Sequence, residues 1–430
     1  MVIPTTQASF DVAAVQRRFP SLARRLDDRP VLYLDGPGGT QVPDSCLDAI
    51  RGYLTASNAN THGAFSASRE SDDLIDDAHA AMADFLGAAS GDEITFGANA
   101  TSLTFTFSRA LGRTFGRGDE VVVTRLDHDS NVATWLALEE ERGITVRWVD
   151  VNLDDCTLDL DSLAAVLGPR TRLVAVGLAS NAVGTINPIA RIAEMAHASG
   201  AQIWVDAVHA APHLPIDVRE LGVDLLVVSP YKFFGPHMGA VWGRRELLED
   251  LAAYKVRPAD NAIPSRFETG TQAHEAQAGL LGTFRYLEWL GVSQGGAAGE
   301  PGAADGDRRS RLKAAMRAIR AYERALTPRL LDGLAGVPGL HMRGILDPAR
   351  LDERCPTVAF TLDGHSPAEV SQWLGGRGIA TWDGDYYAYE LIRALGLDRA
   401  GGMVRVGLAH YNTAEEIDRL VDALGELTRA

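Results

Sequence analysis

Short, nearly continuous apolar runs alternate with amphipathic segments along the first 245 residues of the chain. Such runs are typical of strands that are buried on both faces of a parallel sheet. They lie at 31–36, 93–97, 120–126, 145–151, 172–180, 202–208, 224–229 and 239–243. The intervening segments with apolar residues at helical spacing are 72–87, 101–115, 131–143 and 188–200. This alternation predicts an α/β fold with a mostly parallel, doubly wound sheet.

The pattern changes toward the C-terminal third of the chain. A long helical stretch (272–291) is followed by a Gly/Ala/Pro-rich stretch (292–307), which predicts a flexible insert. A charged helical segment (308–334) and several short apolar runs then predict a small α+β domain. We therefore expect three parts: an N-terminal segment (1–30) that packs on the small domain, a large domain (31–285) and a small C-terminal domain (286–430).

Charge and composition narrow the class of protein. The formal net charge of −16 argues against nucleic acid or an anionic membrane as the main partner. No run reaches the roughly 18 apolar residues of a membrane-spanning helix, and the first residues lack an apolar signal core. Cys46, Cys156 and Cys355 are scattered without the spacing of a metal site or a disulfide scaffold. We expect a cytoplasmic protein without a metal site.

Lysine is rare in this chain, because only Lys232, Lys255 and Lys313 occur among its 41 basic side chains. Lys232 lies in SPYKFFGP, between an apolar run and a Gly-Pro turn. A chain that otherwise uses Arg for positive charge needs Lys where an amine must lose its proton and attack a carbonyl, since a guanidinium cannot. Lys232 is therefore a candidate nucleophile.

Two further features accompany this lysine. Asp206 and His209 stand at the end of another apolar run, in IWVDAVHAA. The turn GANATS (97–102) opens a helix whose first amides and positive dipole end suit a phosphate. An amine, a carboxylate and a phosphate cradle together are what pyridoxal phosphate requires. Taken alone, Asp206 has capping of the following helix as its alternative role.

These motifs carry a resemblance over nearly the whole chain. The order and spacing of YLDGPGG, NTHGAFS, DHDSNVATW, SNAVGTINP, WVDAVHA, SPYKFFGP, RFETGT and VRVGLAHYNT resemble the class V aminotransferase superfamily of fold-type I pyridoxal-phosphate enzymes. Within it, the chain is similar to the group II cysteine desulfurase and selenocysteine lyase branch. The resemblance implies pyridoxal 5'-phosphate as cofactor, a small amino acid as substrate, and a homodimer with shared active sites.

The resemblance also implies roles around the cofactor ring. Lys232 corresponds to the lysine that forms the Schiff base, and Asp206 to the carboxylate that keeps the pyridine nitrogen protonated. His128 would stack on the ring near the proton transfers, with a satisfied core histidine as the alternative. His209 stands where relatives usually have a Gln that contacts the phenolic oxygen. Asn181 would lie near the same oxygen and near the substrate carboxylate.

Other positions correspond to phosphate and substrate ligands. Arg405 corresponds to the arginine that binds the substrate carboxylate in a bidentate manner, with a structural salt bridge as the alternative. His62 and Gly38 are candidates for the pocket wall, with a purely structural role as the alternative. The residues expected to hold the phosphate are Asn99, Ala100, Thr101, Ser229, Tyr231 and, from the other subunit, Thr271.

One loop departs from the desulfurase pattern. Desulfurases carry a Cys on a loop of the small domain, which takes up the sulfur as a persulfide. The matching stretch here is IATWDGDYYAYE (379–390), with Tyr386 or Tyr387 at the Cys position and no thiol nearby. Since a tyrosine hydroxyl cannot hold sulfane sulfur, we expect a reaction other than persulfide formation. Either tyrosine is a candidate proton donor, and simple packing of the loop is the alternative.

The expected function is that of a pyridoxal-phosphate-dependent lyase. It would eliminate a β-substituent, a thiol, from a cysteine-derived or S-substituted amino acid, with Lys232 as the base. The alternatives are an aminotransferase, or an epimerase similar to isopenicillin N epimerase, acting on a small amino acid. A non-catalytic module that binds pyridoxal phosphate is a further alternative, although the sequence has no nucleic-acid-binding appendage to support it.

Overall fold

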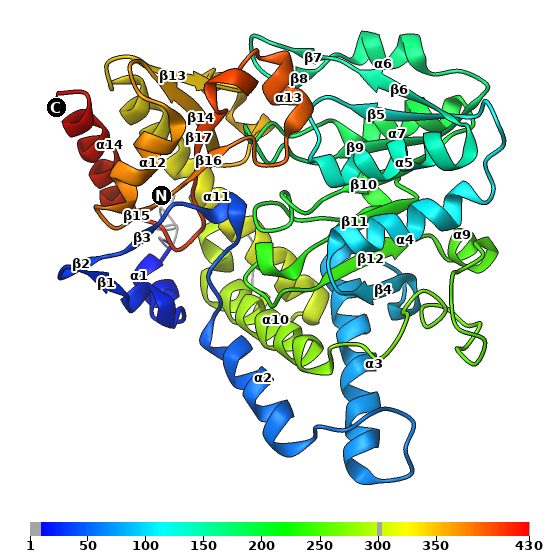
Figure 1. The fold of residues 1–430 in the computed structure, drawn as a ribbon. Helices are drawn as coiled ribbons and strands as arrows, with labels where there is room; N and C mark the ends of the chain where they lie inside the picture. Colours follow the sequence, from blue (N-terminus) through cyan, green and yellow to red (C-terminus); the bar gives the residue numbers. More distant parts are fainter. Residues whose placement is uncertain (1–9, 299–302, 430) are drawn as a thin grey trace, which may run out of the picture.

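The computed structural model describes residues 10–298 and 303–429 and contains a central sheet of seven strands. In spatial order these are β4 (Ile94–Gly97), β12 (Gly239–Gly243), β11 (Leu225–Val228), β10 (Gln202–Asp206), β9 (Thr171–Gly177), β5 (Glu120–Thr124) and β6 (Thr145–Val149). Only β12 runs antiparallel to its neighbours. Figure 1 shows the sheet crossing the right half of the molecule. The mostly parallel sheet and the fold class expected from the apolar runs are confirmed.

Alternate residues of the central strands face two separate apolar cores. Ile203 and Val205 belong to one core, whereas Trp204 between them belongs to the other. The strands are therefore apolar throughout because both faces of the sheet are covered. The helices that supply most of this cover are α3 (Ser66–Leu86), α4 (Ala100–Gly112), α5 (Ala133–Arg142), α7 (Ile189–Ala198) and α10 (His274–Gln294).

A second, antiparallel sheet lies in the C-terminal part of the chain, at the upper left of Figure 1. Its strands are β13 (Leu340–Arg343), β14 (Thr357–Leu362), β17 (Met403–Gly407) and β16 (Trp382–Gly384). The helices beside it are α11 (Arg308–Ala335), α12 (Pro367–Gly375) and α14 (Ala414–Leu427). α14 begins with a capping box, in which Thr413 and Glu416 satisfy each other's backbone amides. A third apolar core fills the space between this sheet and its helices.

The first expected strand, 31–36, is not part of the central sheet, so that expectation was wrong. The observed strand β3 (Leu32–Tyr33) pairs with β15 (Ile379–Ala380) from the C-terminal part. The 3-10 turn Gly36–Gly38 then ends it, because Pro37 has no amide proton for a strand ladder. The apolar pattern predicted a strand correctly but could not say which sheet receives it.

The N-terminal segment also contacts the C-terminal half of the chain. Phe10 stacks on Tyr322 with ring centroids 4.3 Å apart, and the amide of Asp11 donates to the side chain of Gln294. This last residue ends α10, three residues beyond the expected end of that helix. Residues 299–302 of the expected flexible insert lie outside the described residues.

Besides several shorter helices, one long helix was not expected from the sequence. α2 (Asp44–Ala56) packs closely on α10 and projects with the beginning of α3 at the bottom of Figure 1. A Cβ atom at Gly282 of α10 would lie 2.3 Å from the carbonyl oxygen of Ser45, so glycine is needed for this approach. The remaining short elements are α1 (Val12–Gln16), β1 (Arg25–Leu26), β2 (Arg29–Pro30), β7 (Val151–Asn152), β8 (Thr157–Leu158), α6 (Leu160–Val166), α8 (Val218–Leu221), α9 (Arg245–Asp250) and α13 (Tyr389–Ala394).

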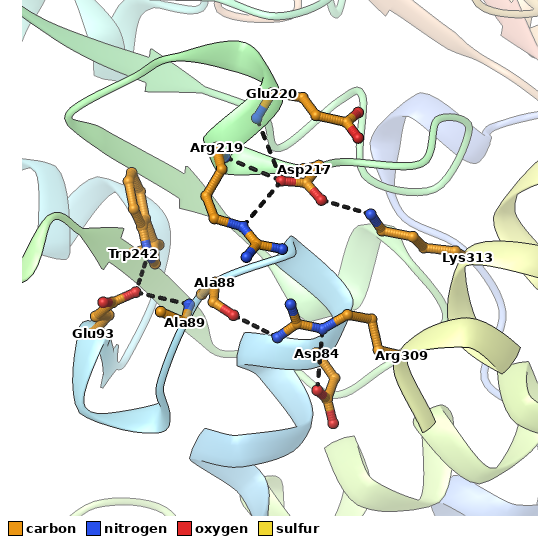
Figure 2. Close-up of polar contacts among 10 residues, drawn as sticks. All are labelled: Asp84, Ala88, Ala89, Glu93, Asp217, Arg219, Glu220, Trp242, Arg309 and Lys313. Carbon is orange, nitrogen blue, oxygen red and sulfur yellow. Dashed lines mark hydrogen bonds and ion pairs between the residues drawn. The ribbon is translucent and has the colours of Figure 1, made fainter. Parts of the chain in front are cut away.

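Charged side chains of α11 attach this helix to the part of the chain that forms the central sheet, as Figure 2 shows. Lys313 pairs with Asp217 at 2.5 Å, and Arg309 contacts Asp84 and the carbonyl oxygen of Ala88. Because α11 also packs on the small sheet, these contacts fix the position of one sheet relative to the other. No helix in the described ranges is both long and apolar enough to cross a membrane.

Candidate active site

A cavity of about 440 Å³ lies beyond the carboxyl ends of the central strands, where open α/β sheets bind their ligands. Residues from both sheets line it. The predicted site residues among them are Gly38, Asn99, Ala100, Thr101, His128, Asn181, Asp206, His209, Ser229, Tyr231, Lys232, Tyr386, Tyr387 and Arg405. The structure therefore gathers fourteen positions, spread from residue 38 to residue 405, around one space.

Lys232 follows β11 on a short 3-10 turn and points its amine into the cavity. Its Nζ donates a hydrogen bond to the carbonyl oxygen of Pro37 over 2.5 Å. Burial lowers the pKa of this amine to about 7, helped by the positive charge of Arg405 and opposed by Asp206. An amine with this pKa is partly unprotonated at neutral pH, which both a nucleophile and a general base require.

Asp206 ends β10 and lies beside the strand that leads to Lys232. One carboxylate oxygen accepts the amide of Val208 at 2.8 Å, so its local contact is a turn rather than a helix cap. Burial raises the pKa of Asp206 to about 6, and this buried carboxylate is suited to meet a positively charged partner. Asp127 lies close by, and burial together with the charge of Asp206 raises its pKa to about 7.

His128 precedes the short turn at the end of β5 and lines the cavity. Its Nδ1 accepts the amide of Ser130 at 3.1 Å, so the proton of the neutral ring is on Nε2. Burial lowers the pKa of His128 to about 4, and the charges of Lys232 and Arg405 act in the same direction. The ring is therefore neutral at pH 7, as a group that stacks on an aromatic cofactor should be.

The phosphate cradle expected from GANATS forms the start of α4. Asn99 caps this helix by accepting the amide of Ser102 at 2.8 Å, and the preceding first-turn amides belong to Ala100 and Thr101. Gly239 of β12 allows this close approach, because a Cβ there would lie 2.4 Å from the carbonyl carbon of Asn99. Amides and the helix dipole together form a site for an anion.

Two residues from the neighbouring strand β11 and its turn complete this end of the cavity. Ser229 is buried at the end of β11, and the ring of Tyr231 stacks on His237 with centroids 4.9 Å apart. The hydroxyl groups of both residues are of the kind that donate to phosphate oxygens.

Arg405 on β17 stands at the opposite side of the cavity. It is 5% exposed, its Nη1 donates to the backbone oxygen of Asn181 at 2.8 Å, and its guanidinium lies 4.4 Å from the centre of the Tyr386 ring. Its Nε and the Oδ1 atom of Asn181 are buried without a hydrogen-bond partner among the described residues. A buried unpaired donor is costly, so these atoms indicate a polar ligand at this place.

His209 lines the cavity between the two sheets. Its Nε2 contacts Thr357 Oγ1 of β14 at 3.1 Å, and burial lowers the pKa of its ring well below the usual value. His209 is therefore a neutral imidazole that can form hydrogen bonds next to the cavity.

Two predicted residues do not line the cavity of the single chain. His62 is exposed on the loop before α3 and lies near Asp72, with Nδ1 and Oδ1 3.4 Å apart. Thr271 is exposed on the loop before α10. The role expected for Thr271 concerns the other subunit and stays a prediction.

Sequence reasoning missed other polar and aromatic residues of the cavity. Asp127 was adjacent to a chosen residue in DHDS, and Trp382 and Asp385 were adjacent in WDGDYY. The signal that could have found Trp382 and Asp385 was the mixture of aromatic and acidic residues in WDGDYY. Functional residues often lie on such loops, and the packing of a loop does not require this mixture.

A mostly parallel sheet that presents Lys232 and Asp206 at strand ends, beside a cavity that a second sheet also lines, is the arrangement expected of a fold-type I pyridoxal-phosphate protein. Residues 32–299 and 311–420 match the class-V aminotransferase family. The chain is 32% identical over 429 residues to a probable cysteine desulfurase of Mycolicibacterium paratuberculosis, covering 96% of this chain and 58% of that protein. It is also 32% identical over 434 residues to a probable cysteine desulfurase of Streptomyces coelicolor, covering 96% of each.

A solved structure of a cysteine desulfurase is also similar to this chain. The apo structure of a cysteine desulfurase from Thermococcus onnurineus NA1 matches with a TM-score of 0.83 at 25% identity, covering 100% of this chain and 99% of that chain. The chain belongs to the class-V aminotransferase family. It spans 58%, 65% and 63% of the length of three longer relatives.

Family membership confirms the expected superfamily and the expected cofactor, pyridoxal phosphate. The residues of this chain fit that group. The start of α4 offers amides to the phosphate, Asp206 offers a buried carboxylate to the ring nitrogen, and Lys232 offers an amine to the aldehyde. The unpartnered Oδ1 of Asn181 is free to accept a hydrogen bond from the bound cofactor or substrate.

Proposed function

We propose that this protein is a pyridoxal-phosphate-dependent lyase that cleaves the C–S bond of a cysteine-derived amino acid by β-elimination. The observation that carries the proposal is the cavity itself. It combines the Lys232 amine, whose pKa is about 7, with the buried guanidinium of Arg405 and has no thiol among the described residues that line it.

Each of three side chains would have a separate role in the reaction. Arg405 would hold the substrate α-carboxylate with its guanidinium, and Lys232 would take the proton from Cα. Pyridoxal phosphate, when bound, supplies the electron sink that makes this proton acidic. Loss of the sulfur substituent from Cβ would then release a thiolate, which Tyr387 at the cavity wall would protonate. Pyruvate, ammonia and the free thiol would be the final products after hydrolysis.

The three cysteines argue against a persulfide route. Cys46, Cys156 and Cys355 are buried, and none of them lines the cavity. Burial raises the pKa of each thiol, to about 11 for Cys156. A buried, protonated thiol is a poor nucleophile toward substrate sulfur. The named relatives are cysteine desulfurases, so desulfuration is the second candidate that an experiment must separate.

The assembly and compartment are also proposals. A homodimer with shared sites would bring Thr271 and His62 of one subunit toward the cavity of the other, which would give these exposed residues a role. The free thiols favour a reducing compartment such as the cytoplasm.

The test is product analysis with S-substituted cysteines and with cysteine. Stoichiometric pyruvate, ammonia and thiol from the conjugates are expected. Alanine with sulfane sulfur from cysteine would establish a desulfurase instead. A keto acid that retains the sulfur would indicate an aminotransferase, and inversion at Cα an epimerase. Absence of any turnover would favour a binding module. The Lys232→Ala variant serves as the blank.

A further inference from the structure

Two aromatic side chains stand exposed at the mouth of the cavity. Trp382 and Tyr387 line the cavity, yet they are 52% and 70% exposed. The indole lies directly over Gly38, where a Cβ atom would be only 2.2 Å from Trp382 Nε1. Large aromatic side chains normally stabilise a protein through the apolar area that they bury, and these two side chains bury little of theirs. One face of the Tyr387 ring is stacked on His128, and one face of the indole lies over Gly38, so the other face of each ring is available to a ligand.

The same mouth is acidic. Asp383 and Asp385 line the cavity, and neither takes part in an ion pair among the described residues. The neighbouring cations Arg125 and Arg393 pair with Glu390 instead. Asp385 Oδ1 accepts the amide of Tyr387 at 2.9 Å, so one carboxylate is held beside one exposed ring.

The electrostatic effect of this rim reaches its neighbours. Burial raises the pKa of Asp129, and the charges of Glu390 and Asp385 raise it further. Burial raises the pKa of Tyr386; the charge of Arg405 opposes this shift, and the charges of Asp383 and Asp385 add to it. The rim therefore carries negative charge that no ion pair among the described residues neutralises.

The interior of the cavity holds a positively charged group as well, next to the carboxylates of Asp127 and Asp206. Arg405 is 5% exposed, and its Nε has no partner among the described residues, which independently indicates an anionic ligand. Trp382 of β16 lies directly opposite Arg405 of β17 in the antiparallel register. Directly opposite residues project from the same face of a sheet, so the anion-binding group and the aromatic rim are side-chain neighbours.

We propose that the rim formed by Trp382, Tyr387, Asp383 and Asp385 binds a cationic group on the departing part of the substrate. The substrate class is then a cysteine S-conjugate whose thiol carries an ammonium or a quaternary ammonium group. Aromatic faces attract such a cation, and the adjacent carboxylates add charge complementarity. This assignment rests on the proposed elimination reaction, because that reaction defines which part of the substrate departs.

The test uses matched ligands on the holoenzyme. S-(2-trimethylammonioethyl)cysteine is compared with its neutral isostere S-(3,3-dimethylbutyl)cysteine and with the anionic S-(2-carboxyethyl)cysteine. Equilibrium binding is measured by calorimetry, and thiol release is measured separately. We expect roughly tenfold tighter binding of the cationic conjugate than of the neutral one. High salt should reduce this preference, because part of it is electrostatic.

Two variants test whether the preference for the cationic conjugate depends on the rim. Asp385→Asn retains the acceptor for the Tyr387 amide but removes a charge, and Trp382→Leu removes an aromatic face. In both, the ratio of cationic to neutral affinity should fall toward one, and Trp382→Phe should restore part of it. Asp398→Asn removes the same charge from an exposed position outside the cavity, so its ratio should equal that of the unmodified protein.

The outcomes separate the two proposals. Equal binding of the cationic and neutral conjugates, or a preference unchanged by Asp385→Asn and Trp382→Leu, overturns the rim assignment. A cation preference that depends on the rim, without thiol release from any conjugate, supports the assignment and contradicts the elimination reaction. Thiol release together with a preference for the neutral conjugate supports the elimination reaction and contradicts the rim assignment.

Discussion

The ring of Tyr387 lies over the ring of His128, with centroids 5.2 Å apart and planes inclined by 25°. The preceding Tyr386 is turned the other way, since its hydroxyl donates to the backbone oxygen of Met403. Both tyrosines have left-handed backbone conformations, with φ of 54° and 59°. Non-glycine residues adopt this conformation at some cost, so the loop holds each ring in a defined place.

This difference predicts different roles for the two tyrosines. Tyr387→Phe should lower kcat for thiol release by about 10²-fold, because the leaving thiolate loses its proton donor. Tyr386→Phe should instead lower the melting temperature, since its hydroxyl is already bonded within the protein. Steady-state kinetics and thermal unfolding of both variants check this. A Tyr387→Phe enzyme with unchanged kcat would exclude that hydroxyl as the proton donor.

Lys232→Ala should abolish the yellow absorbance of the protein and lower turnover by about 10³-fold or more. The fold should survive, because the Lys232 side chain makes one hydrogen bond, to Pro37. Absorbance spectra and circular dichroism measure the two effects. Lys255→Ala is the control, since this lysine contacts only a nearby loop carbonyl and lies outside the cavity. A yellow Lys232→Ala protein would contradict the assignment.

Arg405→Lys should raise KM for the amino-acid substrate by about 10- to 100-fold, with a smaller change in kcat. The lysine keeps the charge but loses the planar pair of donors that binds a carboxylate in a bidentate manner. Initial-rate kinetics over a wide substrate range test this. Arg399→Lys, at an exposed position outside the cavity, should behave as the unmodified enzyme. Equal KM values for both variants would exclude Arg405 as the carboxylate ligand.

The contribution of Asp127 to the stability of the cofactor-free protein should fall as the pH rises from about 4 to about 7. Burial raises the pKa of Asp127 to about 7, so the folded chain binds this proton more tightly than the unfolded chain does. The resulting stabilisation is complete below about pH 4 and is lost as the pH rises through about 7.

Asp127→Asn removes this effect, because an amide does not titrate. Its free energy of unfolding relative to the unmodified protein should therefore increase with pH, by roughly 1.4 kcal/mol per pH unit across that window. Denaturant titrations of both proteins at pH 5, 6 and 7 measure the difference. If the free energies of unfolding of the two proteins changed equally with pH, the carboxyl group of Asp127 would be ionised in the folded protein over the whole range.

The strand ends were the part of the site that the sequence predicted well. Asp206, Ser229 and Lys232 each follow an apolar run, and runs of this type end at the same edge of a parallel sheet. The start of α4 was visible for the same reason, because helix capping is a local property. Family motifs then added roles for Arg405 and Asn181 that no local pattern supplies.

Apart from Tyr387, the residues of the cavity rim were not predictable in this way. Trp382 faces the site only because β16 pairs with β17 and brings it opposite Arg405. Pro37 meets the Lys232 amine only because β3 joins the C-terminal part of the chain rather than the central sheet. The sequence pattern predicted β3 as a strand, but the pairing depends on contacts between residues more than 340 positions apart.

By itself, the sequence determined the layered α/β architecture and the lone reactive amine, because hydrophobic periodicity and residue chemistry act over a few neighbouring positions. The tertiary structure decided which carboxylates, aromatic rings and carbonyl groups surround that amine. Those neighbours set its pKa and the charge of the cavity mouth, since burial and electrostatic interaction depend on distances in space and not on distances along the chain.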